Sequence, residues 1–547
     1  ICLVGSEMCI RDSHGGVLAL DTLMAFGVEE LFTLSGAHVF PLYDAAVQRE
    51  LRLVDVRHES TATFGAEGVA KLTRRPGVAA LTAGPGVTNG VSAVTTARFN
   101  GSPLVVLGGR AAEMGWGRGA LQEFDHVPVM APVTKVSTTL KSTADIPDDL
   151  HAVVTAALTP HRGPVFADLP LDVIFGQVEA RAIPDAVTPR GADPDPDEVR
   201  RAAELIAGAE RPAVIAGTDV WWDGAWAPLR AAVEALRVPT FANGLGRGCL
   251  PADHELAFSR TRGLLKSEAD VVVVIGTPLD FRISFGTFGD AAVVHIVDDP
   301  EGHPDHVTPA CAPVGDLPTI LAALADHAGD RTDHEPWIAR LRDAERAARA
   351  DDDGRLTADT DPIAPTRIYG ELRRRLDRDA IVVCDGGDFV SYAGKYLPSY
   401  EPGCWLDPGP FGCLGTGLGY AMAGRLVHPD RQVVLLLGDG AAGFSLMDAD
   451  TLVRQNLPVV IVIGNNGIWG LEKHPMQLLY GYDVAADLQP GIRYDEIVRI
   501  FGGAGEVVER PDAIGPALDR ALASGVPYVV NVLTDPADAY PRSSNLA

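Results

Sequence analysis

Hydrophobic residues in the last third of the chain form short, uninterrupted runs that end in polar, glycine-rich turns. Residues 433–437 and 459–463 are two such runs, each typical of a strand buried on both faces of a sheet. Between them, apolar residues over 446–453 recur at helical spacing. This pattern predicts a β-α-β unit with polar residues at the carboxyl ends of both strands, where open α/β sheets bind ligands.

The rest of the chain shows the same alternation of short apolar runs and amphipathic segments. Expected strands in the first third are 30–34, 53–56, 78–82 and 104–107, and in the middle third 213–216, 271–275 and 293–297. Expected helices between them include 16–26, 61–70, 89–97 and 226–236. Strands that alternate with helices indicate an α/β fold with parallel sheets.

Two segments interrupt this alternation and predict domain boundaries. Residues 185–197 are rich in Pro, Asp and Gly, and residues 326–361 are charged and rich in Ala, which suggests an exposed helix and a linker. We therefore expect domains at 14–184, 198–350 and 365–535, and a tail at 536–547. Residues 1–13 lack an initiator Met and do not fit a signal peptide, so we interpret them as an artefactual extension.

The amino-acid composition limits the kinds of binding partner that are expected. The 547 residues are 46 % hydrophobic and carry a formal charge of -27 without a Lys/Arg cluster, so neither nucleic acid nor a membrane is an expected partner. No apolar run reaches membrane-spanning length. The seven scattered cysteines have no metal-ligand spacing and favour a reducing cytoplasm.

Oxygen ligands follow the two strands of the β-α-β unit. Asp439 follows the first strand and Asn466 the second, and the turn at Gly438 and Gly440 exposes the backbone N–H groups of Gly440 and Ala441. Mg²⁺ prefers a few protein oxygens together with phosphate oxygens. The sequence therefore predicts a site for a Mg²⁺-bound diphosphate.

A Gly-Asp-Gly motif followed at this spacing by Asn-Asn resembles the signature of thiamine-diphosphate (ThDP) enzymes. From about His14 to its end the chain is similar to the acetolactate synthase group, including the oxalyl-CoA decarboxylase and 2-hydroxyacyl-CoA lyase branch. The resemblance implies a pyrimidine-binding domain at 14–184, a Rossmann-like central domain at 198–350 and a diphosphate-binding domain at 365–535. It also implies a homodimer or homotetramer with active sites shared between subunits.

The resemblance assigns roles to individual residues. Glu59 would be the buried acid that activates the cofactor, and Glu472 would donate a proton at the reacting carbon, although Glu472 also fits a solvated helix position paired with Lys473. Gln122 and His38 match positions that line the substrate pocket. Further substrate contacts are expected from Gly36, Trp469, Ser543 and Ser544.

The remaining assignments concern bound groups. The expected cofactor-binding residues are Gly386, Gly387, Asp388, Gly412, Leu414, Gly438, Asp439, Gly440, Ala441, Asn466 and Ile468. Asp439, Asn466 and Ile468 are the expected metal ligands. Gly217, Gly276, Phe281 and Asp298 follow central strands and are candidate contacts for ADP or CoA.

Three functions fit this pattern. We expect a 2-hydroxyacyl-CoA lyase that releases formyl-CoA and an aldehyde or ketone, because Glu472, the segment 279–286 and the serine-containing tail resemble that branch. The first alternative is acetolactate synthase, a carboligase acting on 2-keto acids. Segment 279–286 lacks the motif of FAD-containing acetolactate synthases, so FAD is not expected. The second alternative is a non-catalytic relative on the same fold.

Overall fold

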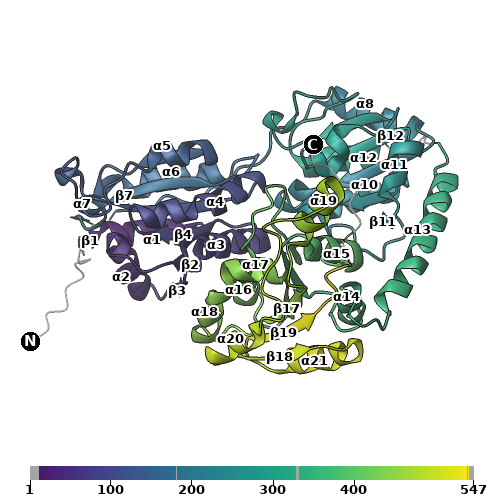
Figure 1. The fold of residues 1–547 in the computed structure, drawn as a ribbon. Helices are drawn as coiled ribbons and strands as arrows, with labels where there is room; N and C mark the ends of the chain where they lie inside the picture. The colour runs from purple at the N-terminus through teal and green to yellow at the C-terminus, as the bar shows by residue number, and fades with distance from the viewer. Residues whose placement is uncertain (1–11, 180, 328–331, 539, 541–547) are drawn as a thin grey trace, which may run out of the picture. The chain divides into compact units, whose positions relative to one another are not determined.

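The computed structural model describes residues 12–179, 181–327, 332–538 and 540. It divides into two compact units. The first comprises the chain up to Ala70 and Arg74–Pro189, and the second comprises Arg190 onward together with Lys71–Thr73. Each unit is described by itself below, and Figure 1 colours the chain from its N-terminus to its C-terminus.

A six-stranded parallel sheet forms the centre of the first unit. Its strand order is β3-β2-β4-β5-β7-β6. The strands are β2 (Glu30–Thr33), β3 (Arg52–Asp55), β4 (Gly77–Leu81), β5 (Leu104–Arg110), β6 (Val136–Thr139) and β7 (Val165–Pro170). The helices are α1 (Gly15–Ala25), α2 (Phe40–Gln48), α3 (Glu59–Thr73), α4 (Pro85–Phe99), α5 (Val127–Met130), α6 (Ile146–Leu158) and α7 (Leu171–Ile174).

One face of this sheet packs on α1, α2 and α6. The core there joins Leu20 and Leu150 of the helices to Val105, Leu107 and other alternate residues of the strands. The chain also begins with an unexpected strand. Residues 12 and 13 lie within the expected artefactual extension, but they belong to β1 (Asp12–His14), which pairs antiparallel with β8 (Gln177–Glu179).

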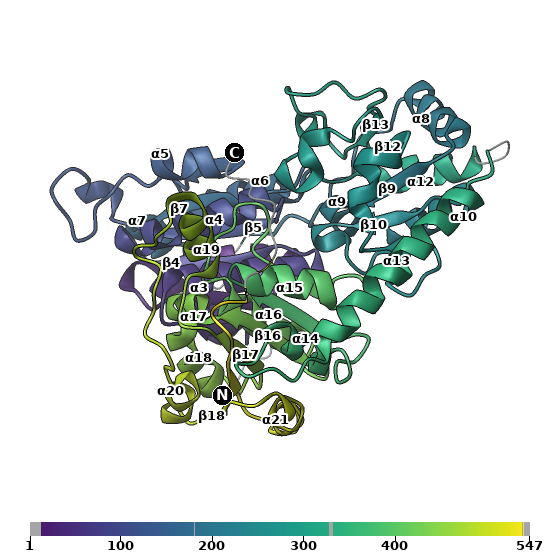
Figure 2. The same ribbon diagram turned by 45° about the vertical axis from the view of Figure 1, so that its right-hand side comes forward.

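The second unit contains two more parallel sheets. The central sheet has the order β11-β10-β9-β12-β13. Its strands are β9 (Pro212–Ala216), β10 (Thr240–Ala242), β11 (Ala257–Phe258), β12 (Val271–Ile275) and β13 (Ala292–Ile296). The helices of this part are α8 (Pro196–Gly208), α9 (Thr218–Trp222), α10 (Trp226–Leu236), α11 (Leu265–Glu268), α12 (Leu317–Asp326) and α13 (Glu335–Leu356). Both views show the long α13 leading from the central sheet to α14 (Figures 1 and 2).

The third sheet has the order β15-β14-β16-β17-β19-β18 and is called the diphosphate sheet here. Its strands are β14 (Ile381–Asp385), β15 (Trp405–Leu406), β16 (Val433–Gly438), β17 (Val460–Asn465), β18 (Ala504–Val508) and β19 (Tyr528–Leu533). The helices are α14 (Thr366–Leu372), α15 (Asp388–Tyr396), α16 (Gly417–Val427), α17 (Asp439–Ser445), α18 (Ala449–Arg454), α19 (Gly470–Tyr480), α20 (Tyr494–Ile500) and α21 (Pro511–Ala523). Its core packs strand residues such as Val434 and Val462 against α14, α15 and α21.

The order of the diphosphate sheet explains where a ligand can bind. The chain forms β14, adds β15 on one side of it and then crosses over to place β16 on the other side. The connections at the carboxyl ends of β14 and β16 therefore diverge, and such a switch point leaves a crevice at the sheet edge. These three parallel sheets confirm the expected α/β class. No described helix has both the length and the apolar character needed to cross a membrane.

Candidate functional site

A cleft of about 500 Å³ opens at the carboxyl edge of the diphosphate sheet. We call it the strand-end cleft. Every residue expected to hold the cofactor lines it: Gly386, Gly387, Asp388, Gly412, Leu414, Gly438, Asp439, Gly440, Ala441, Asn466 and Ile468. These residues come from the ends of three neighbouring strands and from the loop before α16. The structure thus brings the expected cofactor-binding residues, which are far apart in the sequence, together in one cavity.

Asp439 lines this cleft and is 3 % exposed. Its carboxylate accepts hydrogen bonds from the backbone N–H groups of Gly467, at 2.7 Å, and Gly440, at 3.0 Å. Burial raises the pKa of Asp439 to about 6, against the effect of these two hydrogen bonds. The expected tight turn at Gly438 is not found, because α17 begins directly at Asp439 with Gly438 as its N-cap.

The donor set at this point suits Mg²⁺. Asn466 follows the adjoining strand, and its side-chain oxygen accepts a hydrogen bond from the N–H of Ile468 at 3.2 Å, which leaves a second lone pair on that oxygen. A buried carboxylate, an amide oxygen and a nearby backbone carbonyl are hard ligands. A divalent cation would also compensate the charge that Asp439 bears when it is ionised inside the protein. The residues therefore fit the expected metal.

Two glycines show how closely the backbone lines the cleft. Gly386 has φ +101°, a conformation that side-chain-bearing residues rarely adopt. A Cβ atom on Gly440 would lie 2.4 Å from the ring of Trp469, so the indole packs directly on this turn. Trp469 lines the cleft, and Phe444 meets its ring edge-on at 6.4 Å, whereas the role of Trp469 as a substrate contact stays a prediction.

The sequence places Asp385 at the start of the expected diphosphate loop but assigns it no role, and the structure makes it the last residue of β14. Its fully buried carboxylate accepts hydrogen bonds from the N–H groups of Gly415, at 3.0 Å, and Gly417, at 2.9 Å. Burial raises the pKa of Asp385 to about 7. The side chain anchors the loop that carries Gly412 and Leu414 to the sheet edge. An acidic residue that ends a buried strand was the signal that could have identified it.

Glu472 lies on the first turn of α19, is exposed and lines the same cleft. The alternative interpretation paired it with Lys473. The structure instead pairs Lys473 with Asp483, at 3.0 Å, and with Asp487. No described residue forms an ion pair with Glu472. Its carboxylate is therefore available to a ligand, and its role as a proton donor stays a prediction.

The central sheet contributes two cations to the cleft that the sequence did not reveal. Arg247 follows β10, and Arg282 lies in the short 3₁₀ segment η7 (Phe281–Gly286) after β12. Asp280 pairs with Arg282 at 2.7 Å and also accepts a hydrogen bond from its backbone N–H. Arg247 lies over the ring of Trp405 at 4.5 Å. Both guanidinium groups line a cleft that also contains the oxygens expected to bind the metal.

The first unit contains the other expected catalytic residues. Glu59 is the first residue of α3, is 7 % exposed, and accepts a hydrogen bond from the Asn89 side chain at 3.0 Å. His38 is buried, its Nδ1 lies 3.2 Å from the Thr82 hydroxyl, and burial lowers its pKa. Gln122 has φ +57° and packs against Gly84.

The remaining residues that were expected to contact substrate or nucleotide do not, where the structure describes them, lie together in one cavity. A Cβ on Gly36 would meet the Thr82 side chain at 2.3 Å, so this glycine allows close packing of two loops. Gly217 is likewise packed on Thr277 and on the backbone of Gly276. Asp298 is buried after β13, and of the four candidate nucleotide contacts only Phe281 lines the strand-end cleft. Ser543 and Ser544 lie outside the described residues. The roles of these residues stay predictions.

Comparison with known proteins agrees with this geometry. Three models of thiamine pyrophosphate enzymes match: the N-terminal TPP binding domain over residues 14–129, the central domain over 199–324 and the C-terminal TPP binding domain over 385–532. The chain is 53 % identical to the acetolactate synthase large subunit IlvG of Mycobacterium tuberculosis, with 98 % of each chain covered. It is 33 % identical to human 2-hydroxyacyl-CoA lyase 2, covering 95 % of this chain and 90 % of that one.

These matches cover the elements that build the strand-end cleft and those that carry Glu59. The family resemblance drawn from the Gly-Asp-Gly and Asn-Asn motifs is confirmed. The chain belongs to the thiamine-diphosphate-dependent enzymes of the acetolactate synthase and 2-hydroxyacyl-CoA lyase family.

Proposed function

We propose that this chain is a ThDP- and Mg²⁺-dependent carboligase of the acetolactate synthase type, acting on 2-keto acids. Asp439, Asn466 and the carbonyl of Ile468 would hold the metal, and the backbone at Gly386, Gly440 and Ala441 would approach the diphosphate. ThDP supplies an electron sink for cleaving and forming bonds next to a carbonyl group. The chain supplies placement, charge compensation and proton transfer.

One observation carries the choice of substrate. Arg247 and Arg282 line the same cleft as the oxygens expected to bind the metal, and two cations in that cleft suit the carboxylate of a 2-keto acid. An Arg fork binds a planar carboxylate through two parallel hydrogen bonds. The 53 % identity to proteins named acetolactate synthase supports the same choice. The proposal therefore prefers acetolactate synthase, the first alternative from the sequence, over the 2-hydroxyacyl-CoA lyase that the sequence analysis expected.

Cleavage of 2-hydroxyacyl-CoA is the second candidate, and Glu472 favours it. This acid has no ion-pair partner in the part of the chain that the structure describes and lines the cleft, where it could donate a proton to the reacting carbon. The relatives named 2-hydroxyacyl-CoA lyase 2 match over 90 to 95 % of this chain, so the overall architecture is compatible with either reaction. We propose a cytoplasmic location for either enzyme, because the scattered cysteines favour a reducing compartment.

The test of the carboxylate assignment is Arg282→Gln in the ThDP- and Mg²⁺-loaded enzyme. Loss of a charge-assisted contact to the substrate should raise KM for pyruvate at least about tenfold, with a smaller change in kcat. Arg340→Gln is the control, because Arg340 is exposed and pairs with Glu268 at 2.9 Å, away from the cleft. An unchanged KM in Arg282→Gln would remove this role.

A further inference from the structure

The first unit contains a row of buried polar and charged side chains that the proposed function does not use. Arg110 is the last residue of β5, Asp168 lies in the neighbouring β7, and His126 directly precedes α5. We call these three residues the His126 cluster. His126 and Asp168 are fully buried, and Arg110 is 7 % exposed. Burial of such groups is unfavourable unless each one has a hydrogen-bond partner, and the cluster supplies these partners.

The contacts of His126 determine which of its ring nitrogens carries the proton. The backbone N–H of Gly84 donates to Nε2 at 2.9 Å, so Nε2 must be unprotonated. Nδ1 lies 2.9 Å from Oδ1 of Asp168, which accepts a hydrogen bond from the Nδ1–H group. The ring is therefore neutral, with its proton on Nδ1. Asp168 thus favours the one tautomer that can accept from Gly84.

Asp168 favours this tautomer because both of its neighbours are donors. Its Oδ2 accepts from the Arg110 guanidinium at 3.1 Å, while Oδ1 accepts from His126. An ionised carboxylate offers an acceptor to each neighbour, whereas an amide offers one acceptor and one donor. In Asp168→Asn the amide N–H would therefore face either Arg110 or Nδ1 of His126. In the second case the ring proton would move to Nε2 and oppose the Gly84 N–H.

The hydrogen bond to Gly84 joins two segments that adjoin the expected substrate pocket. Gly84 is the N-cap of α4 and has φ +62°. A Cβ atom on Gly84 would lie 3.1 Å from the Cβ of Gln122, so the two backbones are in close contact. Gln122 has φ +57° and precedes His126 by four residues. Both segments thus adopt uncommon backbone conformations, and the His126 side chain connects them.

We propose that His126 is a positioning residue, which holds the segment that carries Gln122 against the turn at Gly84. The neutral tautomer selected by Asp168 makes this contact possible. The inference deepens the proposed function and rests on it, because it requires Gln122 to line the substrate pocket. Misplacement of a group that orients substrate by about 1 Å can slow a reaction by about 10²-fold. His126 therefore affects turnover without contacting the substrate.

Two substitutions separate the hydrogen bond to Gly84 from the filling of space. Gln places its amide oxygen near the position of Nε2 and can accept from Gly84, whereas Asn reaches only the position of Nδ1 and can bond only Asp168. Both remove a ring that packs edge-on against Phe166 at 6.2 Å. We expect kcat/KM to fall at least about tenfold in His126→Asn but less than about threefold in His126→Gln. Equal losses in the two variants would contradict the proposal.

The affinity for ThDP separates this role from a general disturbance of the enzyme. The diphosphate and the metal are expected to bind at the strand-end cleft, which the His126 cluster does not line. The Kd for ThDP, measured by calorimetric titration with Mg²⁺ present, should therefore stay within about threefold of the wild-type value in both variants. A loss of ThDP affinity equal to the loss of kcat/KM would assign His126 to the fold alone.

A double-mutant cycle tests whether His126 acts through Gln122. If it does, His126→Asn should reduce kcat/KM much less when Gln122 is already Ala, because the side chain that it positions is absent. Equal reductions in the two backgrounds would overturn the proposal. The assays use whichever of pyruvate and a 2-hydroxyacyl-CoA the wild type converts. Failure of the wild type to convert pyruvate would therefore count against the proposed function and not against this role of His126.

Hydrogen exchange gives a readout that does not depend on activity. Backbone exchange in a peptide that contains Gly84 should be faster in His126→Asn and in Asp168→Asn than in the wild type, because the Gly84 N–H loses its acceptor. In His126→Gln the exchange should stay close to that of the wild type. Exchange at the wild-type rate in His126→Asn would show that this hydrogen bond does not hold the turn.

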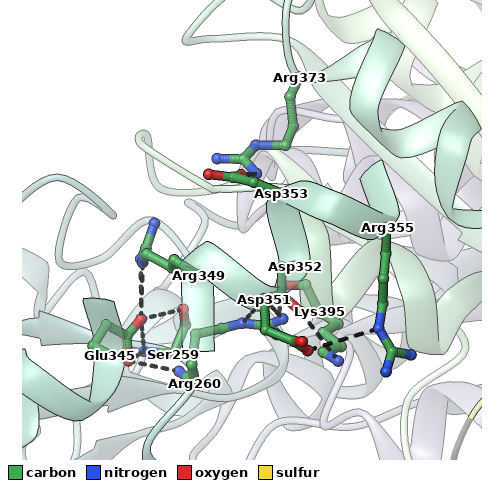
Figure 3. A network of polar contacts seen from close by, with 10 residues as sticks. All are labelled: Ser259, Arg260, Glu345, Arg349, Asp351, Asp352, Asp353, Arg355, Arg373 and Lys395. Atoms are coloured by element: carbon green, nitrogen blue, oxygen red, sulfur yellow. Dashed lines mark hydrogen bonds and ion pairs between the residues drawn. The ribbon is translucent and has the colours of Figure 1, made fainter. Parts of the chain in front are cut away.

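The second unit offers a matched control for the loss of a buried charge. Asp352 is buried, bonds the Arg260 guanidinium with an Nε–Oδ2 distance of 2.8 Å, and lies 3.4 Å from the Lys395 ammonium group. Figure 3 shows Arg260 and Lys395 converging on this carboxylate. Asp352→Asn therefore resembles Asp168→Asn in the kind of contact that it weakens. It should leave the exchange of the Gly84 peptide unchanged, and equal acceleration in both variants would contradict a specific role for the His126 cluster.

Discussion

Asp439 is the first residue of a helix and also lines the strand-end cleft. It begins α17, so its carboxylate meets the free N–H of Gly440, and the chain returning after β17 brings the Gly467 N–H to its other oxygen. Both bonds orient the carboxylate toward the cleft. Burial alone would favour the neutral acid, and a bound cation is what would restore the charged form. The surroundings of Asp439 therefore hold its carboxylate in an orientation and an environment that would favour binding of a cation.

We expect Asp439→Asn to weaken ThDP binding at least about tenfold and to remove its dependence on Mg²⁺. The amide keeps one oxygen for a backbone hydrogen bond but loses the charge that binds the cation, and even supporting residues around metals change affinity by about 10- to 100-fold. The measurement is calorimetric titration with ThDP at several Mg²⁺ concentrations. Asp450→Asn is the control, since that carboxylate pairs with Arg454 on α18 at 2.8 Å. Mg²⁺-dependent binding that persists in Asp439→Asn would exclude this ligand.

The residues of the strand-end cleft differ in how far the sequence could predict them. Gly438, Asp439 and Gly440 are contiguous, and Asn466 follows the next buried run, so local patterns were sufficient. Arg247 and Arg282 belong to another sheet, and only tertiary packing places them in the cleft. No local pattern distinguishes them from the many exposed arginines of the chain. Glu472 was predicted as a site residue. The sequence did not show that Lys473 pairs with Asp483 and Asp487 rather than with Glu472, because the loop that follows α19 brings these two aspartates to the lysine.

At the scale of elements, many buried strands were predicted, although the buried β7 was missed, and strands of two or three residues were not predicted. β12 and α10 have the expected bounds, because five consecutive apolar residues and a clear amphipathic face leave little ambiguity. β10, β11 and β15 have only two or three residues, and pairing with a neighbour, rather than their own composition, defines them. β1 was missed for the same reason, since it is defined by its partner β8.

The central sheet contains a buried histidine that makes its stability depend on pH. His295 of β13 is fully buried, with Nε2 3.0 Å from the Thr277 carbonyl and Nδ1 3.1 Å from Nδ1 of His303. Burial lowers the pKa of His295 to about 4 from the usual 6.5. The folded state thus favours the neutral ring. That stability is fully present above pH 6.5 and is lost as the pH falls toward about 4.

We expect acid to destabilise the protein by about 3 kcal/mol through this residue, because each unit of pKa difference corresponds to about 1.4 kcal/mol. The measurement is the thermal unfolding midpoint between pH 7 and pH 4. His295→Gln can still donate to the Thr277 carbonyl but does not titrate, so its midpoint should fall less with acid. His306→Gln, at an exposed position, should follow the wild type. Parallel pH profiles for wild type and His295→Gln would show that other groups dominate.

At the scale of the whole molecule, the same construction occurs three times. In each large sheet the chain adds strands on one side and then crosses to the other, between β2 and β4, between β9 and β12, and between β14 and β16. Each crossing leaves a switch point at a carboxyl edge. The α/β class followed from the sequence because this alternation is local. The choice between related reactions did not, because it depends on which charged side chains reach the cleft from the other sheet.

The choice between acetolactate synthesis and 2-hydroxyacyl-CoA cleavage can be made by assaying both substrates with the same enzyme preparation. With ThDP and Mg²⁺ present, we expect pyruvate to be converted to acetolactate, and a 2-hydroxyacyl-CoA to be cleaved at least about tenfold more slowly in kcat/KM. The physical reason is that Arg247 and Arg282 add cationic charge to the cleft, which would favour the carboxylate of a small keto acid over the neutral thioester carbonyl of an acyl-CoA. The readouts are acetolactate formed and formyl-CoA released. Faster release of formyl-CoA than of acetolactate would instead support the lyase, with Glu472 as its candidate acid, and Glu472→Gln should then slow formyl-CoA release by about 10²-fold or more.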